Sequence, residues 1–140
     1  SLPDYSTVSD ADVVIMRYAH VLLMIAEAEN EVNGPTEKAL KAINAVRTRS
    51  HQPAIDGTGL TQAELRERIR NEWRVETCFE GLRYFQLKRW KQLQQVVDGV
   101  VDPAYPSYIK VVKPAFEFFP LPQGEIDKAH GVLVQDPNYQ

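Results

Sequence analysis

Three glutamates near the middle of the chain recur at four-residue intervals, a spacing that could do chemistry. Glu72, Glu76 and Glu80 share one face of a predicted helix, because residues four apart stack on the same side. Carboxylates this close repel one another, so the row requires cations opposite it or a bound metal ion. A di-iron bundle needs Glu-x-x-His pairs, and none of the three histidines follows a glutamate at that spacing. The row therefore favours ion pairing over a metal site.

The arginines that follow are the expected partners of this row. Arg83 and Arg89 lie in the stretch EGLRYFQLKRW, and on a helical wheel they fall inside the apolar arc of residues 82–97. An unpaired charge is costly in such a position, and a planar guanidinium suits bidentate pairing with a carboxylate. We therefore predict an ion-pair lattice, defined as the three glutamates with Arg83 and Arg89, that joins two consecutive helices.

Catalytic patterns are missing from the sequence. No nucleophile elbow, phosphate-binding glycine loop or zinc-ligand spacing occurs, and glycoside hydrolysis would need two separated carboxylates in a cleft. Cys78 is the single cysteine and lies among apolar neighbours, with no base placed to ionise its thiol. We expect no catalytic residues, no cofactor and no enzymatic activity.

The overall charge argues against nucleic acid as a partner. The 140 residues include 16 Lys and Arg against 19 Asp and Glu, which gives a net charge of −3. Proteins that hold nucleic acid through its phosphates usually carry a basic surplus. A base-stacking surface in EGLRYFQLKRW is also disfavoured, because only Tyr84 among its aromatics lies off the apolar arc. The longest apolar run, 13–29, contains four charged or titratable residues and predicts a buried helix instead of a membrane span.

An all-α fold of helical hairpins in a single domain is expected to position these residues. The predicted helices run from about 12 to 32, from 37 to 49, from 62 to 80 and from 82 to 97. They pair into hairpins at about 12–50 and 61–98. Residues 99–140 are rich in proline and aromatics, which predicts an ordered, extended wrap over the helices.

The start of the third helix carries the clearest local signal. Thr61 and Glu64 have the spacing of a capping box, in which each side chain accepts a hydrogen bond from the backbone of the other. Leu60 and Leu65 flank this pair as a hydrophobic staple. We expect the helix to begin within a residue or two of Thr61.

Longer stretches resemble the SusD/RagB family of surface nutrient-binding lipoproteins. The similarity covers nearly the whole chain in the correct order, and its segments are IMRYAHVLLMIAEAENEV, KALKAINAVRTRS, LTQAELRERIRNEWRVETCFEGLRYFQLKRW and FFPLPQGEID with VLVQDPNY. The departures are local. His20 stands where the family commonly has glutamate, Thr77 where it has an aliphatic residue, and Gln86 where it has aspartate.

The resemblance implies a tetratricopeptide-like scaffold from the C-terminal portion of a protein several times longer. Members of the family are tethered to the outer-membrane surface by an N-terminal lipid. They pair with a SusC-like TonB-dependent transporter and capture oligosaccharide or peptide for import, without catalysis. On this reading the lipid-bearing cysteine lies upstream of Ser1. The alternative is a helical-repeat adaptor that binds another protein and has no small-molecule ligand.

Exposed aromatic rings are the best candidates for sugar contacts within this chain. Tyr105 and Tyr108 lie in DPAYPSYIK, and a proline-rich loop can hold such rings rigid and accessible. The competing interpretation is that both rings pack the tail onto the helices. Trp73 and Trp90 are expected in the core.

Overall fold

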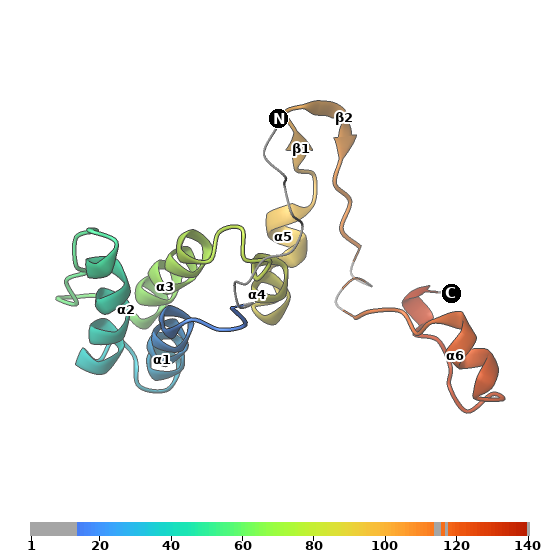
Figure 1. The fold of residues 1–140 in the computed structure, drawn as a ribbon, viewed down its shortest axis with the longest axis horizontal. Coiled ribbons are helices and arrows are strands. Elements are labelled where there is room, and N and C mark those ends of the chain that lie inside the picture. Colours follow the sequence, from blue (N-terminus) through green and yellow to red (C-terminus); the bar gives the residue numbers. More distant parts are fainter. Residues whose placement is uncertain (1–13, 114–115, 117, 140) are drawn as a thin grey trace, which may run out of the picture. The chain divides into compact units, whose positions relative to one another are not determined.

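The computed structural model describes residues 14–113, 116 and 118–139, and most of its ordered elements are helices (Figure 1). The chain divides into two compact units, Ser1–Thr77 and Cys78–Gln140. The first unit contains α1 (Tyr18–Asn33), α2 (Glu37–Arg49) and α3 (Gln62–Glu76). The second contains α4 (Arg83–Arg89), α5 (Leu93–Val97), β1 (Val101–Asp102), β2 (Tyr105–Ile109), α6 (Gln123–Lys128) and a 3₁₀ turn at Pro137–Tyr139.

The first two helices form the predicted hairpin. Gly34, with φ of +79°, ends α1, and its N–H donates to the Asn30 carbonyl at 2.9 Å. The Thr36 hydroxyl accepts a hydrogen bond from the Ala39 N–H at 3.3 Å, so α2 spans the predicted residues 37–49. The start of α1 near residue 12 was predicted too early, because residues 14–17 are not helical. Positions 12 and 13 lie outside the described residues.

The capping box of α3 is confirmed. The Thr61 hydroxyl accepts from the Glu64 N–H at 3.2 Å, and the Glu64 carboxylate accepts from the Thr61 N–H at 2.8 Å. The end of α3, at Glu76, was predicted four residues too late, at residue 80. The Thr77 hydroxyl donates to the Trp73 carbonyl at 2.7 Å, and Phe79 then takes a positive φ of 66°. A bulky residue in that conformation cannot continue a helix.

The core of the first unit lies where α1 contacts both α2 and α3. It is built from helical positions that repeat at three- and four-residue intervals, as an amphipathic pattern requires. The best-buried large apolar residues are Leu23, Ile43, Val46, Leu65, Ile69 and Trp73. The expectation that Trp73 belongs to the core is therefore confirmed.

In the second unit, the single helix predicted for residues 82–97 is two helices. Lys91 has a φ of +56°, which breaks the run between α4 and α5. Leu87, Leu93 and Val112 form a small buried cluster, and Trp90 and Val97 pack against it while partly exposed. Trp90 therefore lies at the margin of a core and not inside one.

The tail after Asp98 contains regular elements that the sequence did not predict. β1 and β2 form an antiparallel hairpin, with Val101 opposite Ile109 and Asp102 opposite Tyr105. The register shifts between these pairs, so β2 has unpaired residues between its two paired positions. The short helix α6 follows later in the tail.

Candidate ligand-binding sites

Glu72 and Glu76 are both bound by arginines within the first unit. The Glu72 carboxylate accepts from Arg47 Nη1 at 2.6 Å, and the two side chains are 7% and 21% exposed. The Glu76 carboxylate accepts from Arg17 Nη1 at 2.7 Å and from Arg49 Nη2 at 2.6 and 2.5 Å. Arg17 Nη2 also donates to the Glu76 carbonyl at 3.0 Å. The end of α3 is thereby tied to the start of α1 and the end of α2.

This pairing corrects the partners predicted for the ion-pair lattice. Positions 72 and 76 share one face of α3, and the arginines that reach them come from α2 and from the residue before α1. Glu80 is exposed and lies beyond the end of α3, in the turn before α4.

Arg83 and Arg89 have a neighbour that the lattice did not include. Their guanidinium carbons lie 6.0 and 5.3 Å from the centre of the Trp90 ring, which is cation–π distance. Arg89 Nη2 also donates to Gln86 Oε1 at 2.5 Å. Gln86 therefore accepts a hydrogen bond from an arginine, at the position where the SusD/RagB family commonly has aspartate.

A buried polar network in the first unit was missed by sequence reasoning. Trp73 Nε1 donates to Glu27 Oε2 at 3.2 Å, and the Trp73 ring lies 6.0 Å from that of buried His20. Asn30, fully buried, donates to the Gln62 carbonyl at 3.0 Å, and Gln62 Nε2 donates to the Asn30 carbonyl at 2.7 Å. The sequence signal for this network was the placement of polar His20 and Asn30 among the buried positions of α1.

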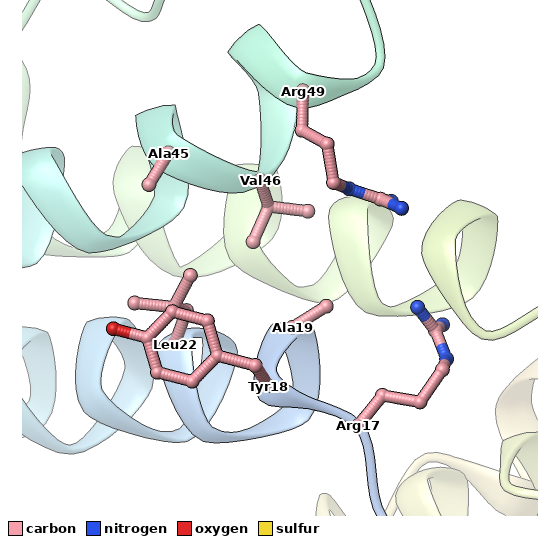
Figure 2. A pocket seen from close by; sticks show the side chains of 7 residues that line it. All are labelled: Arg17, Tyr18, Ala19, Leu22, Ala45, Val46 and Arg49. Atoms are coloured by element: carbon pink, nitrogen blue, oxygen red, sulfur yellow. The ribbon is translucent and has the colours of Figure 1, made fainter.

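A pocket of about 350 Å³ opens between α1 and α2. Figure 2 shows the guanidinium groups of Arg17 and Arg49 reaching toward one another at one side of it, with the Tyr18 ring beside Leu22. Its lining is Arg17, Tyr18, Ala19, Leu22, Ala45, Val46 and Arg49. The pocket therefore combines an apolar body with a cationic edge.

The predicted sugar-contact residues lie on the hairpin of the second unit. Tyr105 and Tyr108 belong to β2 and are 69% and 63% exposed. Tyr105 occupies a paired position opposite Asp102, whereas Tyr108 falls within the shifted part of the register. Both rings are accessible to a ligand. Their role in binding stays a prediction.

A second group of aromatic residues gathers around Lys88, and the sequence did not reveal it. The Lys88 ammonium lies 4.3 Å from the centre of the Phe119 ring and 5.3 Å from that of Tyr84. The Tyr84 ring lies 5.5 Å from Phe85 and 6.3 Å from Phe119. The contact joins Lys88 of α4 to Phe119, which lies 31 positions later, a separation that no local pattern predicts.

The surface carboxylates with altered pKa values serve structural contacts. Hydrogen bonds from Arg66 hold the pKa of Glu31 below its ordinary value. The backbone N–H of Thr61 lowers the pKa of Glu64 within the capping box. Among the described residues, no group of three or more His, Cys, Asp or Glu side chains has the arrangement of a metal site. No described helix has the length and apolarity to span a bilayer.

The helices, their caps and the buried arginine–glutamate pairs define an α-helical hairpin scaffold. Comparison with known proteins shows the family to which this scaffold belongs. The SusD family model matches residues 4–139. The chain belongs to the SusD family, and its mostly helical, tetratricopeptide-like fold is that of its structural neighbours. The resemblance noted from the sequence is thereby confirmed.

Proteins from Formosa and Bacteroides species match this chain. SusD-like protein P2 of Formosa agariphila is 31% identical over 143 residues, covering 94% of this chain and 26% of P2. The crystal structure of a SusD-like protein from Bacteroides fragilis is 31% identical, with a TM-score of 0.77 over 90% of this chain and 26% of that one. Surface glycan-binding protein A from Bacteroides thetaiotaomicron is 30% identical, with a TM-score of 0.68 over 88% and 24%. The chain thus spans about a quarter of the length of these relatives.

Proposed function

We propose that this chain is part of a non-catalytic protein that captures oligosaccharides at the outer face of the outer membrane. The match of the SusD family model to residues 4–139 carries this proposal. The similarity to a surface glycan-binding protein supports a carbohydrate as the ligand. In this role an N-terminal lipid anchors the protein to the membrane. The protein binds the oligosaccharide and delivers it to a SusC-like TonB-dependent transporter.

The first unit supplies the rigid support in this proposal. Glu72 and Glu76 are buried against three arginines, and apolar side chains fill the space between the helices. Neutral sugars gain little from such charges. A pyranose instead offers a C–H face, for which an exposed aromatic ring is the suitable partner. We assign that contact to Tyr105 and Tyr108 on β2.

Calorimetric titration with neutral oligosaccharides tests this assignment. Tyr105→Ala and Tyr108→Ala should each weaken binding by about fivefold or more, the scale of one lost aromatic contact, without changing the thermal midpoint. Ile109→Ala is the matched control, because Ile109 is 55% exposed on the same strand and has no ring. Unchanged binding in both tyrosine variants would remove the hairpin from the sugar site.

A test of the transporter partner and of the cellular location requires the full-length protein. Full-length protein, expressed in its own host, should label with a fatty acid, be accessible at the cell surface and copurify with a TonB-dependent transporter. Recovery from the cytosol with another protein and no glycan binding would instead support the adaptor alternative.

A further inference from the structure

The Lys88 aromatic group, defined as Lys88 with Tyr84, Phe85 and Phe119, is a surface patch outside the buried cluster of the second unit. Its three rings are 37%, 59% and 69% exposed. The planes of Tyr84 and Phe85 meet at 77°, and those of Tyr84 and Phe119 meet at 48°. Because the rings do not stack face to face, they leave one another's faces uncovered. The group therefore offers flat apolar surface to a ligand.

The cation of this group has no anionic partner in the described part of the chain. The Lys88 ammonium lies 4.3 Å from the centre of the Phe119 ring and 5.3 Å from that of Tyr84. Within the described residues it forms no ion pair and no hydrogen bond. Lys38 and Lys128, by contrast, each pair with a glutamate. Lys88 is half-buried, and an ammonium has three N–H donors that a ligand can occupy.

The backbone that carries Phe119 is restrained on both sides. The Tyr139 hydroxyl donates to the Phe118 carbonyl at 2.6 Å. The Gln135 side chain accepts from the Leu121 N–H at 3.0 Å and donates to the Leu121 carbonyl at 2.9 Å. The Phe119 ring is thus held near Lys88 before any ligand arrives, which reduces the ordering cost of binding.

We propose that the Lys88 aromatic group binds an anionic sugar, with the C–H face of the pyranose on the rings and its carboxylate or sulfate on the Lys88 ammonium. Such binding rests on the proposed glycan-capturing function and narrows its ligand class. A neutral sugar offers the ammonium only hydroxyl groups, whereas a carboxylate or sulfate adds an ion pair to the hydrogen bond. An acidic peptide side chain supplies the anion but has no flat C–H face for the rings.

General electrostatic attraction does not favour such a ligand. The chain has a net charge of −3, so its overall field repels an anion. A preference for anionic sugars must therefore come from a local cation, and Lys88 is the cation that lies among exposed rings.

Calorimetric titration of the 140-residue chain with two pairs of tetrasaccharides tests the proposal. One pair is tetragalacturonate and its methyl ester, and the other is a sulfated galactan tetrasaccharide and its desulfated form. In at least one pair, the anionic form should bind about tenfold or more tightly than the uncharged form. Higher salt should reduce this difference. The pair that shows it identifies the anion as carboxylate or sulfate. Equal binding within both pairs, or no binding at all, would overturn the proposal.

Substitutions locate the charge preference. Lys88→Gln should lower the affinity for the anionic form to that for the uncharged form, whereas Lys88→Arg keeps the charge and should keep the preference. Lys41→Gln is the matched control, because it removes the same charge from an exposed position of α2 and should change nothing. Phe119→Ala should weaken both forms by about fivefold or more, through loss of a ring contact. A preference that persists in a folded Lys88→Gln variant, or an equal loss in Lys41→Gln, would contradict the site.

Binding of neutral sugars separates failure of this site from failure of the proposed function. Neutral oligosaccharides that bind through Tyr105, without any preference for anionic forms, would overturn the Lys88 site alone. If no sugar of either kind binds, glycan capture by this chain is overturned as well. Competition by an oligoglutamate peptide at lower concentration than by tetragalacturonate would identify an acidic polypeptide as the ligand and would overturn the sugar. Thermal melts confirm that each variant is folded, and if Lys88→Gln unfolds, the two tetrasaccharide pairs decide on the unsubstituted chain.

Discussion

The two units of the chain bury their apolar residues to different degrees. In the first unit, Leu23, Ile43 and Leu65 are fully buried among three helices. In the second unit, the buried cluster consists of Leu87, Leu93 and Val112, while large apolar side chains such as Phe118 and Phe119 are 65% and 69% exposed. The first unit therefore gains far more from removing apolar surface from water.

Polar contacts follow the same division. Buried Glu72 and the largely covered Glu76 link α3 to α1 and α2, and Asn30 ties the end of α1 to the start of α3. In the second unit, the hydrogen bond from Arg89 to Gln86 is exposed. Exposed contacts contribute little to folding free energy. The difference teaches that the first unit is the self-supporting scaffold of this chain.

The largest expected effect is the loss of a buried charge partner. Arg47→Ala should lower the free energy of unfolding by about 3–5 kcal/mol, because Glu72 would stay buried without its cation. Arg89→Ala, on the exposed side of α4, should cost less than about 1 kcal/mol. Urea unfolding followed by circular dichroism measures both. Equal losses of stability for the two variants would support the ion-pair lattice predicted from the sequence, in which Arg89 is a buried partner.

Truncation of core residues sharpens the comparison between the units. Leu65→Ala, at a fully buried position, should cost about 3 kcal/mol through lost burial and the cavity left behind. Val112→Ala removes fewer atoms from a smaller cluster and should cost about 1 kcal/mol. The same urea titration provides the values. A larger loss for Val112→Ala would place the main core in the second unit.

The cap of α3 gives a smaller effect. Thr61→Ala should lower the free energy of unfolding by about 1 kcal/mol, because the Glu64 N–H loses its acceptor. Leu60→Ala should weaken the same helix end if the expected staple with Leu65 forms. Thr58→Ala is the nearby control and should change stability by less than about 0.5 kcal/mol, since its contact with Asp56 is exposed. A control as costly as Thr61→Ala would argue against the capping box as the source.

The smallest effect concerns acid stability. Arg66 lowers the pKa of Glu31 in the folded state, below the ordinary value of 4.5. The pair therefore stabilises the fold above that value, and its contribution disappears as the pH falls through the folded-state pKa. Thermal melts from about pH 6 to about pH 3 should show a slightly smaller decline for Glu31→Gln than for the unsubstituted chain. An identical decline would mean that solvent screens the pair completely.

Local signals in the sequence were sufficient for much of the first unit. Thr36 and Thr61 fix helix starts through bonds to residues three positions away, so short patterns reveal them. The apolar stripe of α2 and the burial of Trp73 follow from helical periodicity. The breaks at Phe79 and Lys91 were missed, because each requires a positive φ at a residue type that rarely adopts one.

The candidate sites depended more on tertiary structure. The spacing of Glu72 and Glu76 correctly indicated a buried row that needs arginines, but the choice of arginines depends on which helices α3 packs against. The α1–α2 pocket and the Lys88 aromatic group each unite residues distant in sequence. The exposure of Tyr105 and Tyr108 agrees with a sugar-contact role, whereas ligand identity is not encoded in any local pattern.

Hydrogen–deuterium exchange of the intact 140-residue chain, followed peptide by peptide in native buffer, tests most directly whether the first unit is the self-supporting scaffold. Backbone amides of α1, α2 and α3 should exchange slowly and together, because their opening requires breaking the core and the buried ion pairs. Peptides from residues 99–113 and 118–139 should exchange much faster, since few of their apolar side chains are buried. Similar protection in both units, or faster exchange in α1–α3, would contradict this division of stability.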